Sequence, residues 1–315
     1  MDILVVGLGV IGATYGYLFS KAGHRVKHFL RKGSPKASIG RLNVDLLDGR
    51  INAKGLAVSD VYNVEHCSRK HYDFIFVSVP SGGWSGVAKT LEDEGISGTA
   101  LLCSGIWGER SAVSERFGQN YVLGYPVAGG NIVGDTLTCC VFDHFMLERG
   151  ERAAIADCAQ LESLFGSCSI KLERPHDMLE WIWLHMAINA AVVAVAGKHG
   201  SIADTAASAE GLMDSSAKLA EAVRAIRETV AIVAARGVCL RNYRNELWAY
   251  RLPTWLSAPL MKRMFRNNIM TRKIMTLHGN VDDLRFVCQC LYDSGKRLGI
   301  DAPVFYGAVD AVLCG

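Results

Sequence analysis

The chain has 315 residues, with 34 Lys and Arg against 31 Asp and Glu and a formal net charge of +3 at pH 7. This near balance of charge argues neither for nor against a nucleic-acid partner. Because no run of Lys and Arg of the kind that binds a phosphate backbone is present, we expect no nucleic-acid partner. The length predicts two domains, each able to bury a core.

The ten cysteines could form a disulfide framework, but their positions in the sequence favour reduced thiols. Most lie in apolar runs, none forms a C-x-x-C pair, and the N-terminus lacks the basic segment of a signal peptide. We therefore expect reduced thiols and a cytoplasmic protein. The apolar stretch 184–197 looks too short to span a bilayer, so no membrane partner is expected.

The chain opens with a buried-strand pattern at residues 3–6 and a glycine-rich turn in G-x-G-x-x-G spacing, followed by a helical pattern over 13–22. In this motif the first glycine permits the turn, the second lets the backbone approach a pyrophosphate, and the third packs helix on strand. The free N–H groups at the helix start then favour the negative charge. The predicted dinucleotide-binding residues are Gly7, Leu8, Gly9, Val10, Ile11 and Gly12.

The end of the second predicted strand, residues 25–31, indicates which dinucleotide is bound. NAD enzymes place an acidic residue there, whereas NADP enzymes tend to place an Arg. No acidic residue lies between Asp2 and Asp45, and Arg31, Lys32 and Ser34 form a cationic group. This group suits the 2′-phosphate of NADP(H), and the alternative is a solvated basic turn.

The first half of the chain continues with an irregular stretch over 33–55, a short apolar run at 56–58, and strand patterns at 73–79, 99–103 and 121–124. Strands that alternate with helical segments predict an α/β fold with a doubly wound parallel sheet. Ligands bind at the carboxyl ends of such strands. The cofactor is therefore expected to contact Ser78, Pro80, Ser81, Ser104 and Gly105, although each is equally compatible with ordinary turn chemistry.

The second half is predicted to be helical. Asp177 and Glu180 have capping-box spacing ahead of a helix that should end at Gly197, and two further helices are expected over 214–236 and 275–298. We place an NADP-binding Rossmann domain at 1–170 and an all-α substrate and dimerisation domain at 171–315.

The first of these helices carries a candidate catalytic group. Trp181, His185 and Asn189 are spaced by four residues and share one face. A histidine can deliver the proton that a reduced carbonyl or imine requires, and an amide can orient the substrate oxygen. The alternative is a hydrogen-bonded core histidine.

Later in the chain, Asp282 and Asp283 form a carboxylate pair able to hold a substrate hydroxyl or amine, or simply a solvated helix start. A group of cations is compatible with an acidic substrate or with a solvated face: Arg251, Lys262, Arg263, Arg266, Arg272 and Lys273. No metal-ligand spacing is found.

With these residues in view, the chain resembles the ketopantoate reductase family. The likeness rests on residues 3–12, on the strand that ends at Arg31, and on three later stretches: Trp183-x-His185-x-Ala187-x-Asn189, 228–237, and Arg297-Leu298-Gly299-Ile300-x-x-Pro303. The resemblance implies a Rossmann domain, a helical C-terminal domain, NADPH and reduction of a 2-keto acid.

The chain departs from the family pattern at functional positions. The family's catalytic lysine falls on His185, while its asparagine is kept as Asn189. A cofactor-side lysine falls on Pro80, an Asn-Gly pair becomes Ser104-Gly105, and a late glutamate falls on Asp283, or near Asp282 with a one-residue gap. These departures imply a substrate other than ketopantoate.

The sequence therefore predicts an NADPH-dependent reductase of a small 2-keto acid or related carbonyl compound, with His185 as the proton donor. Asn189 and Asp283 or Asp282 would orient the substrate, and a homodimer is compatible with the family. The alternatives are an opine- or imine-forming reductase and an NADP-binding protein without catalysis.

Overall fold

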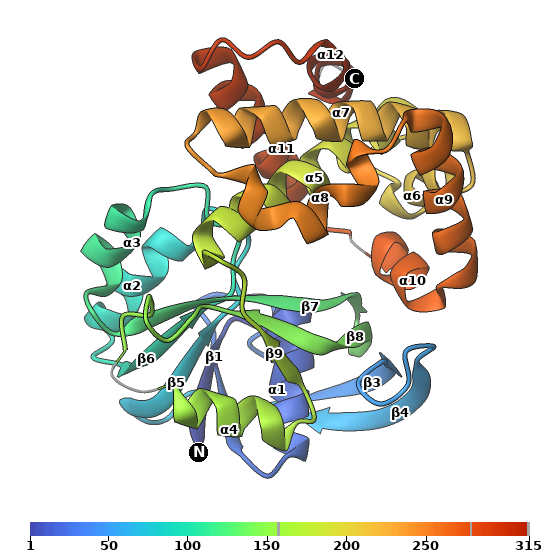
Figure 1. Cartoon of the computed structure of the whole chain (residues 1–315). Helices are drawn as coiled ribbons and strands as arrows, with labels where there is room; N and C mark the ends of the chain where they lie inside the picture. The colour runs from blue at the N-terminus through green and yellow to red at the C-terminus, as the bar shows by residue number, and fades with distance from the viewer. Residues whose placement is uncertain (156–157, 278, 314–315) are drawn as a thin grey trace. The chain divides into compact units, whose positions relative to one another are not determined.

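The computed structural model describes residues 1–155, 158–277 and 279–313 (Figure 1). The chain forms two compact units, Met1–Leu179 and Glu180–Gly315. The first unit extends past the boundary expected at residue 170, because strand β9 (Lys171–Glu173) pairs in parallel with β8 (Thr136–Leu147).

The first unit is built on one sheet whose strand order is β2-β1-β5-β6-β7-β8-β3-β4, with β9 beside β8. Its Rossmann-like half is parallel and consists of β2 (Arg25–Phe29), β1 (Asp2–Val6), β5 (His71–Val77), β6 (Ser97–Leu102) and the start of β7 (Tyr121–Val133). Three helices connect these strands: α1 (Val10–Lys21), α2 (Trp84–Asp93) and α3 (Arg110–Phe117). The expected α/β class with a parallel Rossmann sheet is confirmed.

The other half of the sheet was not predicted. β3 (Arg41–Asp48) occupies the stretch expected to be irregular and pairs antiparallel with β4 (Leu56–Asn63), while β7 continues to Val133 and pairs antiparallel with β8. The expectation for 33–55 was wrong because apolar and polar residues alternate in β3, the pattern of a strand with one buried face. The sheet is therefore mixed rather than wholly parallel.

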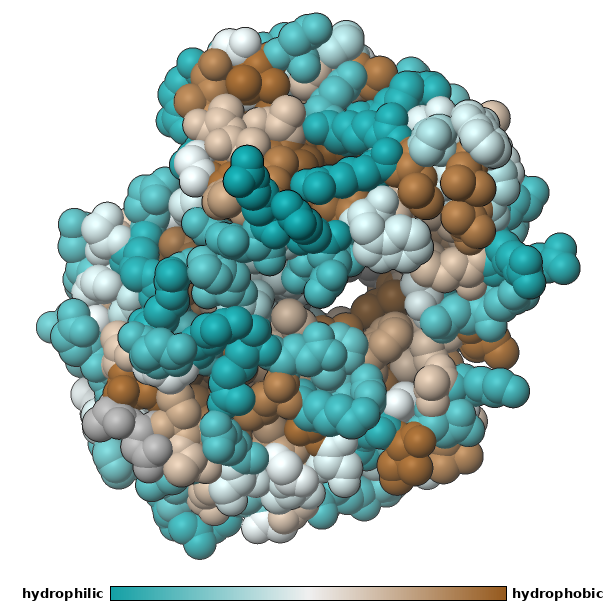
Figure 2. All heavy atoms as spheres, viewed as in Figure 1, coloured by the Kyte–Doolittle hydropathy of each residue, from teal (hydrophilic) through white to brown (hydrophobic). Residues whose placement is uncertain are grey.

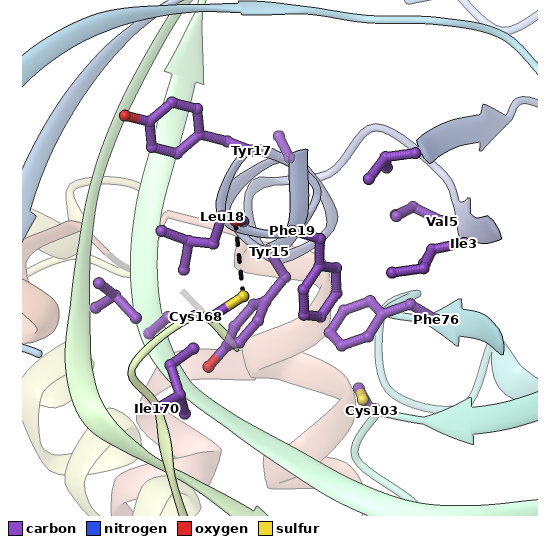
Figure 3. Packing of buried hydrophobic residues seen from close by; sticks show 14 of the residues in the cluster. Ile3, Val5, Tyr15, Tyr17, Leu18, Phe19, Phe76, Cys103, Cys168 and Ile170 are labelled. Atoms are coloured by element: carbon purple, nitrogen blue, oxygen red, sulfur yellow. Dashed lines mark hydrogen bonds between the residues drawn. The ribbon is translucent and has the colours of Figure 1, made fainter. Parts of the chain in front are cut away.

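The core of the first unit surrounds α1. Tyr15 and Phe19 point from this helix toward Phe76 of β5, with ring centroids 5.3 and 5.8 Å from the Phe76 ring, and the Cys168 thiol donates to the Leu18 carbonyl at 3.6 Å (Figure 3). Aromatic packing of this kind adds to the free energy gained by burial. It holds α1, and with it the glycine turn, against the sheet.

The second unit contains no strand among its described residues. Its helices are α5 (Met178–Lys198, which begins in the first unit), α6 (Thr205–Met213), α7 (Ser216–Ala235), a 3-10 turn at Leu240–Tyr243, α8 (Arg244–Arg251), α9 (Thr254–Asn267), α10 (Ile269–Leu277), α11 (Val281–Arg297) and α12 (Pro303–Leu313). The helical C-terminal half is thus confirmed.

Two helix boundaries differ from the sequence-based expectation. Helix α5 passes through Gly197 and ends at Lys198. The helix expected over 275–298 is two helices, because Asn280 caps the start of α11 by accepting from the Asp283 N–H at 3.3 Å. The asparagine cap starts a new helix, so the stretch predicted as one continuous helix is divided in two.

Helix α5 is long and apolar enough to span a membrane by length and composition, the one such helix in the described part of the chain, and 61% of its apolar window is buried. The apolar segment is therefore longer than expected. Thr229 Oγ1 donates to the Ala187 carbonyl at 2.9 Å and the Cys288 thiol to the Ala190 carbonyl at 3.6 Å, so neighbouring helices cover it. These contacts are those of a core helix of the second unit.

The nine cysteines of the described residues are all free thiols, as expected for that part of the chain. Cys314 lies outside the described residues. Among the free thiols, burial raises the pKa of Cys139 to about 12, which keeps that thiol protonated and unreactive.

One face of α9 carries exposed apolar side chains. Leu256, Leu260 and Met264 are spaced by four residues and are between 36% and 45% exposed. Figure 2 shows hydrophobic residues gathered in the region where Figure 1 places α9. We refer to these three residues as the α9 stripe.

The packing of α1 predicts the effect of a single methyl group. A Cβ at Gly16 would lie 2.7 Å from the Tyr62 hydroxyl and 3.0 Å from His28 Nε2, both held in the core. Gly16→Ala should therefore lower the free energy of unfolding by about 1–3 kcal/mol in urea titrations. Gly166→Ala in α4 (Ala159–Ser167), where nothing lies within 4 Å, is the control and should raise stability by up to about 1 kcal/mol. Equal effects of the two substitutions would contradict this account of α1 packing.

Candidate functional site

The three glycines of the N-terminal motif have the geometry that the motif predicts. Gly7 has a φ of +91°, which favours glycine, and its N–H donates to the Phe29 carbonyl at 2.8 Å. A Cβ at Gly12 would lie 2.9 Å from both Ser78 Oγ and Val5 Cγ1, whereas nothing lies within 4 Å of one at Gly9. The turn is thus tight at Gly7, closely packed at Gly12 and open at Gly9.

The start of α1 is left available to an anion. Gly9 is the N-cap, no side chain caps the first turn, and that turn holds no acidic residue. The first N–H groups of a helix have no partner within the helix and carry partial positive charge. With the open space at Gly9, they form a cradle that fits a pyrophosphate. Leu8, which was also predicted to bind the dinucleotide, has a side chain that belongs to the hydrophobic core and is 2% exposed.

A buried histidine that was not predicted supports this turn. His28 on β2 is fully buried, with Nδ1 2.8 Å from the Gly7 carbonyl and Nε2 2.8 Å from the Tyr62 hydroxyl. Because a carbonyl only accepts, Nδ1 carries the proton and Nε2 accepts from the tyrosine. Burial lowers the pKa of His28 to about 4, so the ring is neutral near pH 7.

Cations gather beside the same turn, as the sequence indicated, with one addition. Arg31 and Lys32 are exposed just after β2, and neither has an ion-pair partner among the described residues. Lys36, which was not predicted, extends back to the turn and donates from Nζ to the Leu8 carbonyl at 2.8 Å. Burial lowers the pKa of Lys36. Only the fold of the 31–36 loop brings this lysine to the turn, since its position in the sequence carries no motif.

The loops after β5 and β6 lie beside the turn, because β1 pairs with β5 and β5 with β6. Ser78 Oγ packs against Gly12, and Ser104 Oγ donates to the Val79 carbonyl at 2.8 Å. The Gly105 carbonyl accepts from the Gly82 N–H at 3.3 Å, and Pro80 is exposed. The two serines and the buried Gly105 therefore shape the loops, while Pro80 is exposed at the carboxyl end of the sheet, the edge where such sheets bind ligands.

In the second unit, helix α5 places Trp181, His185 and Asn189 on one half-buried face. The rings of Trp181 and His185 are stacked, with centroids 5.0 Å apart and planes within 13°. The stack covers one face of the imidazole and sets its plane. Asn189 makes no side-chain hydrogen bond within the described part of the chain, so its amide has donors and an acceptor for a ligand.

Asp282 and Asp283 lie in the first turn of α11, where Asp282 is exposed and Asp283 is half-buried. Carboxylates are favoured there by the helix dipole. Helix α11 packs on α5 through the bond from Cys288 to Ala190, next to Asn189 in the sequence.

A buried charge cluster that sequence reasoning missed lies where α5 begins. Glu148 is fully buried, accepts from the Leu123 N–H at 3.1 Å and pairs with Arg110 at 2.5 Å, while Arg152 pairs with Asp177. Burial raises the pKa of Glu148, although the positive charge of Arg110 opposes this shift.

The start of α5 is capped by only one of the two residues of the expected capping box. Asp177 accepts from the Leu179 N–H at 2.9 Å and so caps α5. Glu180 instead accepts from the Tyr243 hydroxyl at 2.7 Å.

The neutral, buried state of His28 predicts how stability depends on pH. An unfolded histidine has a pKa of about 6.5 and folded His28 one of about 4, so below pH 6.5 only the unfolded chain gains this proton. Its contribution to the free energy of unfolding is complete above pH 6.5 and falls by about 3 kcal/mol as the pH drops to 4. His28→Asn, which keeps a donor for Gly7 but does not titrate, should lose this dependence. Denaturant titrations at pH values from 7 to 4 measure the free energy of unfolding of both proteins. If it fell equally with pH in the wild type and in His28→Asn, a neutral buried His28 would be refuted.

Comparison with known proteins places this geometry in context. The family model described as ketopantoate reductase PanE/ApbA matches residues 3–125, which run from β1 to the start of β7. No curated protein sequence matches the chain.

Solved structures match over nearly the full length. A D-mandelate dehydrogenase complex with NADH has a TM-score of 0.68 at 12% identity, covering 100% of this chain and 98% of that one. A PanE/ApbA family ketopantoate reductase from Ralstonia eutropha has a TM-score of 0.67 at 16% identity, with 100% and 98% covered. A dimeric ketopantoate reductase from Staphylococcus aureus has a TM-score of 0.61 at 11% identity, with 98% of each chain covered. At these identities the matches show a shared fold. The resemblance inferred from the sequence is therefore confirmed over residues 3–125, which match the ketopantoate reductase family model.

Proposed function

We propose that the protein is an NADPH-dependent reductase of a small 2-keto acid or a related carbonyl compound. The observation that carries this proposal is the open glycine turn with Arg31, Lys32 and Lys36 beside it. The family match over residues 3–125 supports the reaction class, as do the dehydrogenase and reductase names of the structural relatives.

The cofactor residues have separate tasks in this proposal. The pyrophosphate would lie on the first N–H groups of α1 at Gly9, Val10 and Ile11, where the space in front of Gly9 is open. Arg31 and Lys32 would bind the 2′-phosphate, and Lys36 would add a third positive charge at the turn. A carboxylate, which would select the bare ribose of NADH, is missing between Asp2 and Asp45.

The helical unit would supply the proton. When bound, the nicotinamide supplies a hydride to the substrate carbonyl carbon, and the developing oxyanion requires a proton. His185 suits this role because imidazole exchanges protons near neutral pH, and its stack on Trp181 holds the ring in one plane. Asn189 would donate to the substrate oxygen, and Asp283 or Asp282 would bind a substrate hydroxyl or amine.

A homodimer and a cytoplasmic location are also part of the proposal. The α9 stripe is an apolar surface of the kind that subunit association buries, and the Staphylococcus aureus relative is dimeric.

The cofactor proposal predicts a selective loss of NADPH affinity. Arg31→Ala should weaken NADPH binding by roughly tenfold to a hundredfold, the range for loss of charge-assisted hydrogen bonds, with NADH affinity nearly unchanged. Arg25→Ala is the matched control, because Arg25 lies at the opposite end of β2 and pairs with Asp2 at 2.5 Å. Calorimetric titration measures each affinity. Wild-type protein that binds NADH more tightly than NADPH would overturn the assignment.

The catalytic proposal predicts a loss of turnover without loss of cofactor. His185→Ala should lower kcat by about 10²-fold or more, the usual contribution of a general acid, while the Kd for NADPH stays within error. His199→Ala, which removes a histidine hydrogen-bonded to Glu221 just after the same helix, should leave kcat unchanged. Unchanged turnover in the His185 variant would remove this residue from the mechanism.

The alternatives are separated by one substrate screen. NADPH oxidation that requires both an amine and a keto acid would identify an imine- or opine-forming reductase. Tight NADPH binding without oxidation across keto acids and imines would identify a binding protein without catalysis.

A further inference from the structure

The helical unit holds a second cationic site, separate from the glycine turn. A surface hollow of about 470 Å³ is lined by one residue at the start of α7 and five on α9: Ser216, Pro259, Lys262, Arg263, Arg266 and Asn267. Three of the six carry a positive charge and none is acidic. A hollow of this size falls in the range of small-molecule sites, roughly 300–1,000 Å³.

These positive charges are not used by the fold. Lys262, Arg263 and Arg266 form no ion pair and no side-chain hydrogen bond among the described residues. The nearby carboxylate of Asp214 is already bound by both terminal nitrogens of Arg272, at 2.8 and 2.7 Å. The charge of Lys262 adds to the lowering of the Asp214 pKa, which Arg272 dominates. The three cations that line the hollow therefore have no ion-pair partner, and the nearby carboxylate of Asp214, which does not line it, is already bound by Arg272.

The buried face of α9 determines which side of this helix carries the three cations. Ser257, Ala258, Met261 and Phe265 are buried and fix the helix against its neighbours. With 3.6 residues per turn, Lys262, Arg266 and Pro259 then share a second face, which Arg263 borders. The α9 stripe adjoins the hollow, because Arg263 and Asn267, which line the hollow, lie next to Leu256 around the helix.

The start of α7 adds to the positive electrostatic potential of the hollow. Its first turn holds no acidic residue, and the N-cap Ser215 accepts only from the Lys218 N–H, at 3.4 Å. Ser216, in that first turn, lines the hollow. The positive end of a 20-residue helix thus adds to the field of the three side chains.

We propose that this hollow binds a small phosphorylated compound that carries two or more negative charges. Two arginines and a lysine around one concave surface match the oxygens of a diphosphate, because guanidinium groups bind phosphate through paired N–H donors. Asn267 and Ser216 supply further polar groups. The surface is concave and carries few cations, which favours a small molecule over a nucleic acid. The site goes beyond the proposed reductase function and does not depend on it.

The test uses inorganic pyrophosphate as the probe and the full-length protein. Calorimetric titration should detect a binding event that Arg263→Ala/Arg266→Ala weakens by roughly tenfold or more. Arg244→Ala/Arg251→Ala removes the same charge from exposed positions on α8 outside the hollow, and should leave this event unchanged. Circular dichroism establishes that each variant is folded.

Hydrogen exchange locates the binding event and separates it from the glycine turn. Pyrophosphate should slow exchange of the backbone amides at 216–218 in the wild type and in Arg31→Ala, but not in Arg263→Ala/Arg266→Ala. Protection confined to residues 9–12, equal loss of binding in both double variants, or no binding of pyrophosphate would each overturn the proposal.

Discussion

The hydrogen bond from His28 Nδ1 to the Gly7 carbonyl ties the glycine turn to the rest of the first unit. Gly7 also donates to the Phe29 carbonyl, so the turn is joined to the end of β2 through both its N–H and its carbonyl. The other nitrogen of His28 bonds to Tyr62, which comes from β4 at the far edge of the sheet order. Since the ring is buried and neutral, this link depends on one protonation state. The antiparallel strands outside the Rossmann half thereby help to hold the turn on which the cofactor proposal rests.

The contact between α1 and the sheet depends on the same residues. Gly16 and Gly12 have no side chain where His28, Tyr62 and Ser78 approach the helix. Larger residues at these positions would move α1 away from β1 and with it the N–H groups of its first turn. Close packing, rather than charge, therefore sets the geometry of the proposed phosphate cradle.

In the helical unit, the candidate functional side chains lie on single faces of helices α5 and α9. Helix α5 is a core helix on one side and carries Trp181, His185 and Asn189 on a half-buried face, while α9 buries one face and exposes a cationic face and an apolar stripe. In both helices the 3.6-residue period separates structural from functional positions. The start of α5 is fixed by Asp177, which also lies 3.9 Å from Arg110, the ion-pair partner of Glu148.

The sequence alone was sufficient for the features that depend on local pattern. The spacing of Gly7, Gly9 and Gly12, the apolar runs of the parallel strands and the spacing of Trp181, His185 and Asn189 predicted the turn, the Rossmann half and a shared helix face. It also showed Arg31 and Lys32 after β2, because these cations follow a recognisable strand. Local patterns carry this information since neighbours in the sequence stay neighbours in the fold.

Only the tertiary structure decided the contacts between distant residues. His28 with Tyr62, Lys36 with the turn, Glu148 with Arg110 and the hollow shared by Ser216 and α9 join residues whose separation along the chain obeys no period. The mixed half of the sheet belongs here too, because β8 pairs with both β7 and β3, and strand pairing over such separations is settled by burial of a common face. Hydrophobic burial and desolvation act through space, so these features became visible only once the chain was folded.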